Sequence, residues 1–274
     1  MVNSTIYKIF KTGSKTFFTT SLFFPPGVRD DVFIFYSFVR VADDLVDSIP
    51  AQIDEFNTFK ENYRKSLSGV KSGNEIIDLF VEFMKRKKIP PEWIEAFLHS
   101  MTLDTYKKNY RLEQELSEYL YGSAEVVGLV MCKILDLPTE SYNYARLLGR
   151  AFQYINFIRD IAEDNTLGRC YFGENMLSAY GLKSLAYADV KNQKDKFNAF
   201  MKQAIGQYIA CQNDAEKGFV YIPKRYLIPI KAAADVYRLT AKIISKDPLV
   251  VFKKKIKPNK IRIVYNILYN CLTL

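Results

Sequence analysis

The chain has 274 residues, 49% of them hydrophobic and 15% aromatic, which is enough apolar material for a sizeable core in one uniform domain. One histidine and four scattered cysteines without a CxxC pair exclude the common zinc and haem ligand sets and favour a reducing compartment. The formal net charge is +9, yet no nucleic-acid-binding motif accompanies it, so we expect no nucleic-acid partner. With no signal peptide and no apolar run long enough to cross a bilayer, we expect a cytoplasmic protein.

Helical periodicity dominates the chain. Apolar residues recur at three- and four-residue spacing, most clearly in residues 112–135 and 142–164. Prolines fall between the periodic segments, as expected for helix boundaries, at Pro25, Pro26, Pro50, Pro90, Pro91, Pro138, Pro223 and Pro258. There is neither an alternating strand pattern nor a repeat. The sequence therefore predicts an all-α fold, a single domain over residues 1–274 with about ten helices packed around a shared centre.

A polar stripe runs along the helix predicted after Pro26. Its members are Tyr36, Arg40, Asp43 and Asp47, spaced by four, three and four residues, so their side chains project from one helical face. Asp44 lies one step round the helix. The flanking residues are apolar, namely Val32, Phe33, Phe35, Phe38, Val39 and Val41. A face that would ordinarily join the core is therefore charged.

A second predicted helix repeats this arrangement. Its stripe consists of Gln153, Asn156, Asp160 and Asp164, spaced by three, four and four residues, and Glu163 shares their face. The flanks are again apolar, namely Phe152, Tyr154, Ile155, Phe157, Ile158 and Ile161. Each stripe thus combines an amide or a cation with two carboxylates.

The residues alone leave two interpretations of these stripes open. A lone acidic pair on a helix is most often the solvated face of an amphipathic helix. Two stripes with apolar flanks favour burial, where each carboxylate costs several kcal/mol unless a cation or a metal ion compensates it. Mg²⁺ prefers one or two carboxylates together with water and phosphate oxygens, and the EF-hand pattern of calcium sites is absent. We therefore interpret the stripes as a metal site that holds a diphosphate.

Four motifs, in order, make the chain similar to the squalene and phytoene synthases, the head-to-head prenyl synthases, over nearly its whole length. SKTFFTTSLFFP (residues 14–25) resembles the family's N-terminal substrate segment, and YSFVRVADDLVD (36–47) resembles its first aspartate-rich motif. YLYGSAEVVG (119–128) is similar to its tyrosine–alanine–glycine signature, and FQYINFIRDIAEDNTLGRCYF (152–172) to its second aspartate-rich motif with the following arginine–tyrosine flap.

Two residues depart from the family pattern. Glu125 stands where the family usually has glycine, and Gly173 stands where it usually has proline. We expect Glu125 either to add an acid near the cavity or to turn outward, and Gly173 to loosen the flap.

The resemblance implies an isoprenoid-synthase-type helical bundle with a central active-site cavity, prenyl diphosphate substrates, and Mg²⁺ (or Mn²⁺) as cofactor. The implied metal ligands are Asp43, Asp44, Asp47, Asn156, Asp160 and Asp164. The implied catalytic residues are Tyr36, Arg40, Tyr119, Arg159, Arg169 and Tyr171, and the implied substrate-binding residues are Ser14, Lys15, Thr16, Phe17, Gln153 and Asn156. Hydroxyl groups of Ser14, Thr16 and Tyr171 are expected at the diphosphate, and the rings of Phe17, Tyr36, Phe38 and Tyr119 are expected to face carbocations.

The implied reaction joins two allylic diphosphates head to head through a cyclopropyl diphosphate. Formation of phytoene from two geranylgeranyl diphosphates, as in carotenoid biosynthesis, is the favoured product type. Squalene or dehydrosqualene formation from farnesyl diphosphate is the alternative, and only squalene requires NADPH. A class I terpene cyclase and a non-catalytic assembly-factor relative are further alternatives. Head-to-tail prenyl synthases also carry DDxxD, but their following arginine pair is absent here and their second motif is an aspartate pair. The full set of carboxylates disfavours the non-catalytic relative.

The basic C-terminal region predicts a peripheral contact with the cytoplasmic face of a membrane. Its cations are Lys253, Lys254, Lys255, Lys257, Lys260 and Arg262, and the apolar tail IVYNILYNCLTL follows directly. Each basic residue near an anionic surface contributes about 1 kcal/mol to attachment. A solvated basic helix docked on the domain is the equal alternative. The sequence does not predict an oligomeric state.

Overall fold

The structure, a computed structural model, describes residues 3–256 and 260–274. Over these residues it is all-helical apart from one isolated β-bridge between Asn109 and Cys170, which confirms the predicted fold class. The α-helices are α1 (Ser4–Gly13), α2 (Lys15–Ser21), α3 (Pro26–Asp47), α4 (Ile53–Leu67), α5 (Glu75–Lys87), α6 (Pro91–Tyr106), α7 (Glu113–Leu120), α8 (Val126–Ile134), α9 (Tyr142–Arg159), α10 (Ile161–Thr166), α11 (Glu174–Ala179), α12 (Tyr187–Val190), α13 (Lys194–Glu216), α14 (Lys224–Lys246), α15 (Val250–Lys253) and α16 (Lys260–Thr273). The described chain therefore has more helices than predicted, because several periodic segments are divided.

The long helix α3 carries the first polar stripe and is anchored by aromatic side chains on its opposite face. Pro26 occupies the first turn, where its missing N–H costs no hydrogen bond. Phe38 is fully buried, with its ring stacked 3.8 Å from that of Phe80 and 4.9 Å from that of Phe59. These contacts join α3 to α4 and α5, which leaves the polar face free to border the cavity.

The second polar stripe is not on one continuous helix, which corrects the prediction for residues 142–164. The helix α9 ends at Arg159, and Asp160 has φ −100° and ψ 13° before α10 begins. Arg159 and Asp160 are adjacent, and their side chains form an ion pair that neighbouring residues of a regular helix cannot reach. The N–H of Asp164 still bonds to the carbonyl of Asp160, so Asp164 keeps its place on the same side.

The segment 112–135 is also interrupted, by a π-helical turn over Tyr121–Glu125 between α7 and α8. This turn fits closely against α9: a Cβ on Gly149 would lie 2.3 Å from the carbonyl oxygen of Ala124. Glu125 is buried in the turn and forms ion pairs with Arg146 and Arg150 of α9. The side chain is thus turned away from the cavity, toward the neighbouring helix.

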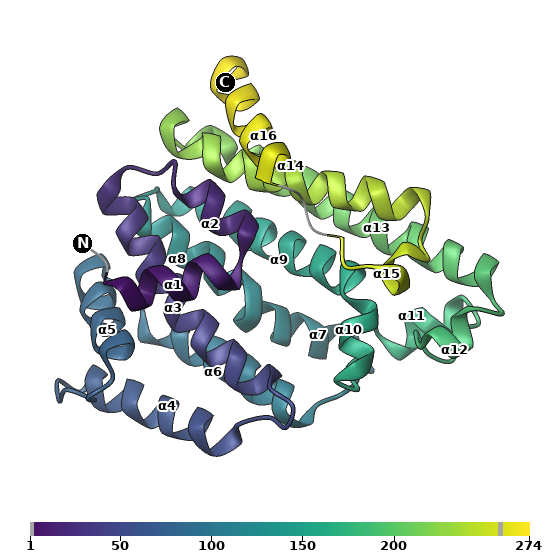
Figure 1. The fold of residues 1–274 in the computed structure, drawn as a ribbon, viewed down its shortest axis with the longest axis horizontal. Coiled ribbons are helices and arrows are strands. Elements are labelled where there is room, and N and C mark those ends of the chain that lie inside the picture. Colours follow the sequence, from purple (N-terminus) through teal and green to yellow (C-terminus); the bar gives the residue numbers. More distant parts are fainter. Residues whose placement is uncertain (1–2, 257–259) are drawn as a thin grey trace.

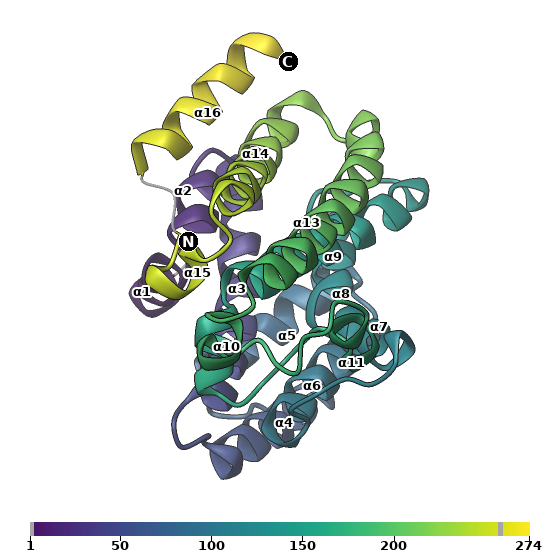
Figure 2. The same cartoon turned by 90° about the vertical axis from the view of Figure 1, so that its right-hand side faces the viewer.

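The buried side chains form two large clusters, one mainly from α1, α3, α5, α6 and α8 and the other mainly from α9, α13 and α14. Phe17 of α2 packs against both clusters. In Figure 1, α4 lies on one side of the molecule and α13, α14 and α16 on the opposite side, with α3 and α9 between them. The C-terminal α16 packs on the outside, against α14 and α2 (Figures 1 and 2). No helix in the described ranges is both long and apolar enough to cross a membrane.

Candidate active site

A cavity of about 1120 Å³ lies between the two clusters and is lined by α1, α2, α3, α6, α8, α9, α10, α14 and the loop after α10. Of the residues predicted for the site, all except Phe38 border it: Ser14, Lys15, Thr16, Phe17, Tyr36, Arg40, Asp43, Asp44, Asp47, Tyr119, Gln153, Asn156, Arg159, Asp160, Asp164, Arg169 and Tyr171. The chain therefore brings segments that are far apart in sequence around one space. Much of the rest of the wall is apolar, including Phe97, Met101, Val127, Met131 and Leu135.

On the α3 side of the cavity, Arg40 is held between two carboxylates. Its Nη1 donates to Oδ2 of Asp43 at 3.1 Å, and its Nη2 forms an ion pair with Asp44. The ring of Tyr36 stacks on Phe10 of α1 with centroids 3.9 Å apart. Burial raises the pKa of the Tyr36 phenol, which therefore stays neutral at physiological pH.

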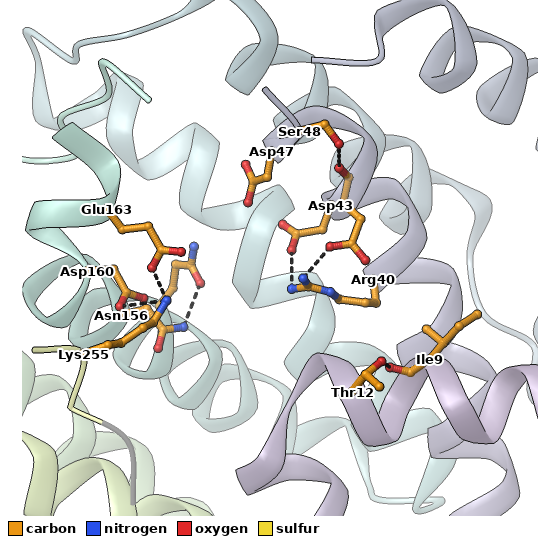
Figure 3. Close-up of polar contacts among 12 residues, drawn as sticks. Ile9, Thr12, Arg40, Asp43, Asp47, Ser48, Asn156, Asp160, Glu163 and Lys255 are labelled. Atoms are coloured by element: carbon orange, nitrogen blue, oxygen red, sulfur yellow. Dashed lines mark hydrogen bonds and ion pairs between the residues drawn. The ribbon is translucent and has the colours of Figure 1, made fainter. Parts of the chain in front are cut away.

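On the opposite side, the residues of α9 and α10 carry their own cations. Arg159 Nε donates to Oδ1 of Asp160 at 2.9 Å. Lys255, which follows α15, lies 3.4 Å from the same oxygen and also forms an ion pair with Glu163. Figure 3 shows Asp43 and Asp47 facing Asp160 and Glu163 from the two sides.

Burial, with a smaller effect from neighbouring carboxylates, raises the proton affinity of one aspartate in each stripe. Burial, and then the negative charge of Asp47, raises the pKa of Asp43 to about 7 against the opposing effect of Arg40. Burial, and then Asp160, raises the pKa of Asp164 to about 8 against the opposing effect of Arg169. The neighbouring arginines therefore do not offset the effects of burial and nearby carboxylates on these two aspartates.

Hard divalent cations fit this donor set. The donors are carboxylate oxygens and the side-chain oxygen of Asn156, which is buried and has no hydrogen-bond partner among the described residues. Within those residues, no three histidine, cysteine, aspartate or glutamate side chains converge closely enough to hold a metal ion alone. This arrangement suits Mg²⁺, which takes few protein ligands and completes its coordination with water and phosphate oxygens.

The loop after α10 ties the two sides together. Arg169 is buried there, forms an ion pair with Asp47, and donates from Nη2 to the carbonyl oxygen of Val46 at 3.0 Å. Gly173, one residue beyond the predicted flap motif, has φ −57° and precedes α11, so its backbone does not require glycine.

The polar residues on the cavity wall that the sequence analysis did not assign to the site include Asp104, Tyr237 and Lys255. Asp104 had a usable signal, because it continues the apolar stripe of Ile94, Phe97 and Met101 on α6 at helical spacing. Lys255 was assigned to the basic C-terminal region, and nothing in its local sequence indicates that it reaches Asp160.

One detailed expectation needs correction, for Phe38, while the hydroxyls of Ser14 and Tyr171 have partners within the protein and their contacts with a diphosphate stay predictions. Phe38 does not border the cavity, because it lies within the aromatic core of α3, α4 and α5. The hydroxyl of Ser14 accepts the N–H of Phe17 at 3.2 Å and so caps α2. The hydroxyl of Tyr171 donates to Asp104 at 2.8 Å, so it is engaged with the protein.

Comparison with known proteins identifies the family. Residues 10–262 match the model of the squalene/phytoene synthase family. The chain belongs to this family. A 15-cis-phytoene synthase from Paracoccus sp. (strain N81106 / MBIC 01143) is 25% identical over 258 residues, which cover 90% of this chain and 84% of that protein. A bifunctional lycopene cyclase/phytoene synthase from Pyrenophora tritici-repentis is 28% identical over 86% of this chain, and the match spans 45% of that longer protein.

Solved structures confirm the fold of this squalene/phytoene synthase family member. The crystal structure of a dehydrosqualene synthase in complex with ligand superposes with a TM-score of 0.88 at 22% identity, over 98% of this chain and 95% of that chain. The helical bundle expected from the resemblance is therefore present. The individual roles of the predicted site residues stay predictions.

Proposed function

We propose that this chain condenses two allylic prenyl diphosphates head to head, most directly two geranylgeranyl diphosphates to phytoene. The observation that carries the proposal is the cavity itself. Two sets of carboxylates, one from α3 and one from α9 and α10, face each other across a space that is otherwise largely apolar. Its volume of about 1120 Å³ is at the upper end of ordinary small-molecule pockets, as two prenyl chains require.

The metal ligands in this proposal are Asp43, Asp47, Asp160 and Asp164, with Asn156 and the more exposed Asp44 beside them. Bound Mg²⁺ would neutralise the diphosphate and so assist its departure as a leaving group. Arg40, Arg159 and Lys255 already lie beside these carboxylates and supply positive charge where the diphosphate oxygens would bind. The ion pair between Arg169 and Asp47 links the loop after α10 to α3.

The reaction then depends on keeping carbocations dry. Departure of the first diphosphate gives an allylic cation, and the double bond of the second donor attacks it. Loss of a proton closes a cyclopropyl diphosphate, which ionises, rearranges and loses a second proton to give phytoene. The rings of Phe17, Tyr36 and Tyr119 border the cavity and offer π-electrons to these cations.

The product chemistry has one specific competitor. The close superposition on a dehydrosqualene synthase favours fifteen-carbon donors as the second candidate. Incubation of the purified protein with Mg²⁺ and either geranylgeranyl or farnesyl diphosphate, with and without NADPH, distinguishes the candidates. We expect phytoene without NADPH. Dehydrosqualene would establish the second candidate, squalene formed only with NADPH would establish the hydride-dependent reaction, and no head-to-head hydrocarbon under any condition would exclude the proposal.

We also propose that the C-terminal region contacts a membrane surface. The outer face of α16 exposes Tyr265, Leu268, Tyr269 and Leu272, while Ile263 and Ile267 are buried. Tyrosine and leucine together suit the boundary between lipid headgroups and acyl chains. The charge contribution is smaller than the sequence suggests, because Lys255 is paired inside the site and Lys253 pairs with Asp247. Lys257 lies outside the described residues.

A further inference from the structure

Asp104 is a buried carboxylate on the cavity wall that belongs to neither polar stripe. It is 3% exposed and lies near the end of α6. Its Oδ2 accepts the hydroxyl of Tyr119 at 2.8 Å, and its Oδ1 accepts the hydroxyl of Tyr171 at 2.8 Å. Both carboxylate oxygens are therefore occupied by phenols that come from different parts of the chain, α7 and the loop after α10.

The two phenols belong to an ordered stack of rings. Tyr171 lies between Phe157, whose ring is 4.3 Å away and nearly parallel at 9°, and Tyr119, whose ring is 5.2 Å away at 27°. All three rings border the cavity. Hydrogen bonding to one carboxylate fixes both phenol oxygens, so neither tyrosine side chain can swing away from the wall without breaking a charge-assisted bond.

Stability alone is a weak reason for a carboxylate at this position. A hydrophobic residue would continue the stripe of Ile94, Phe97 and Met101 without the desolvation penalty of several kcal/mol that a buried charge carries. Arg169 compensates part of that charge but is already bound to Asp47 and Val46. Unlike an apolar residue, the carboxylate accepts hydrogen bonds from two phenols, and its negative charge raises the electron density of their rings.

We propose that Asp104 is a positioning residue that holds Tyr119 and Tyr171 as a fixed, electron-rich wall against which the allylic cations form. The inference rests on the proposed head-to-head condensation. A phenol that donates to a carboxylate gains electron density in its ring, which strengthens cation–π attraction. A wall that is held in place also excludes water, the nucleophile that would capture the cation as a prenyl alcohol.

The test compares two isosteric changes at buried aspartates. Asp104→Asn keeps one acceptor oxygen and replaces the other with a donor, so one phenol loses its hydrogen-bond acceptor and both lose the negative charge. Asp31→Asn is the matched control: Asp31 is 5% exposed, pairs with Arg86 on α5, and does not border the cavity. For both variants we would measure the melting temperature, kcat and KM with the donor that the wild type uses, the share of donor released as prenyl alcohol, and calorimetric binding of inorganic diphosphate with Mg²⁺.

Asp104→Asn is expected to lower kcat by about 100-fold, the effect typical of a misplaced active-site group, with KM and diphosphate binding nearly unchanged. The share of prenyl alcohol should rise several-fold. Asp31→Asn is expected to lower the melting temperature while kcat and the alcohol share stay at the wild-type values. The inference is overturned if Asp104→Asn keeps the wild-type kcat and alcohol share, or if Asp31→Asn changes both to the same extent.

A second pair of variants covers the case in which Asp104→Asn does not fold. Tyr119→Phe and Tyr171→Phe each keep the ring and remove the hydroxyl that binds Asp104, so each should raise the alcohol share as well. A wild-type alcohol share in both would overturn the inference. The proposed function is judged separately, because it fails if the wild-type protein forms no head-to-head hydrocarbon at all.

Discussion

The aspartates of the two stripes are partly buried and close to other carboxylates, and the neighbouring cations compensate their negative charge only in part. Asp43 lies beside Arg40, and Asp160 lies beside Arg159 and Lys255, yet the pKa values of Asp43 and Asp164 are raised well above the ordinary aspartate value of 3.8. A chain that keeps several half-buried carboxylates in mutual repulsion gives up stability there. Binding of a divalent cation with diphosphate would remove that cost, which is why we assign these residues to substrate binding.

Replacing one of these carboxylates should abolish most activity without unfolding the protein. We expect Asp43→Asn and Asp160→Asn each to lower turnover by about 100-fold or more, because each removes a negative charge that would hold the metal ions at the leaving diphosphate. Circular dichroism should show unchanged helical content. Glu82→Gln, on α5 and outside the cavity wall, serves as the control with wild-type turnover. Near-wild-type turnover in either aspartate variant would contradict the two-stripe metal site.

The raised pKa values also predict how the metal-free protein responds to pH. Asp43 and Asp164, with pKa values of about 7 and about 8, bind protons more tightly in the folded than in the unfolded state, where 3.8 applies. Their contribution to stability is therefore full below about pH 4 and is lost as the pH rises through 7 and 8. After chelation, the melting temperature should fall between pH 5.5 and 8.5, and Asp43→Asn should reduce that fall.

Addition of Mg²⁺ with inorganic diphosphate should raise the melting temperature more at pH 8.5 than at pH 5.5. A metal-free protein whose melting temperature rises over this interval, in the wild type and in Asp43→Asn alike, would show that the buried carboxylates of the stripes do not control the pH dependence of stability.

Residue spacing predicted the composition of the site better than its detailed contacts. Tyr36, Arg40 and Asp43 could be grouped because one helix displays them on one face. The pairing of Arg169 with Asp47 could not be predicted, since it joins residues more than a hundred positions apart through the fold. Phe38 was misassigned because spacing shows that a ring is near a stripe but does not show on which side of the helix it packs.

At the scale of elements, the sequence predicts helix starts that are marked by proline, but it does not predict helix breaks that lie at contacts between elements. Pro26 and Pro91 mark helix starts correctly, since proline suits the first turn. No proline or glycine lies at the helix break at Asp160, so the sequence does not predict it. The π-helical turn at Tyr121–Glu125 contains one such residue, Gly122. Both positions contact other elements, since Asp160 pairs with Lys255 and the π-helical turn packs against α9.

Glu125 links that π-helical turn to α9, and its loss should weaken the fold more than the chemistry. Its Oε2 accepts Arg146 Nε at 2.7 Å and its Oε1 accepts Arg150 Nε at 2.7 Å, while the side chain is 2% exposed. We expect Glu125→Ala to lower the free energy of unfolding by about 1.5–3 kcal/mol, the range for hydrogen bonds to charged groups. Urea denaturation measures this change.

The control for that measurement is Glu118→Ala on α7. Glu118 is 70% exposed and lies 3.7 Å from His99, so its removal should change stability by no more than about 0.5 kcal/mol. KM and the product should be unchanged in Glu125→Ala, because Glu125 does not border the cavity. A change of product length in this variant would instead make Glu125 part of the specificity machinery.

At the scale of the whole molecule, the outer face of α16 exposes several large apolar side chains close together. Leu268 and Leu272 are 56% and 87% exposed, and Tyr265 and Tyr269 are exposed beside them. The helix packs against α2 and α14, and both of these helices also border the cavity (Figure 2). A membrane held against α16 would therefore lie one helix layer from the site, which suits a hydrocarbon product that water does not dissolve.

Flotation with vesicles tests this contact. The wild-type protein should float with anionic vesicles at low salt and less with neutral vesicles or at high salt, because both charge and apolar area contribute. The double variant Leu268→Ser, Leu272→Ser should lose most of the flotation. Val220→Ser, at another exposed apolar residue, should not change it. Equal recovery with both vesicle types at both salt concentrations, or full flotation of the double variant, would remove the membrane contact from the account.

In the proposed reaction, one product molecule contains two donor chains joined head to head. An equal mixture of unlabelled and fully deuterated geranylgeranyl diphosphate, incubated with the purified protein and Mg²⁺ without NADPH, tests it in one mass spectrum. We predict phytoene in three mass forms, with the mixed-label form the most abundant, because each molecule draws its halves at random from the two pools. A hydrocarbon found only in the two single-donor masses would mean that each product comes from one donor, as in a terpene cyclase, and would contradict the account.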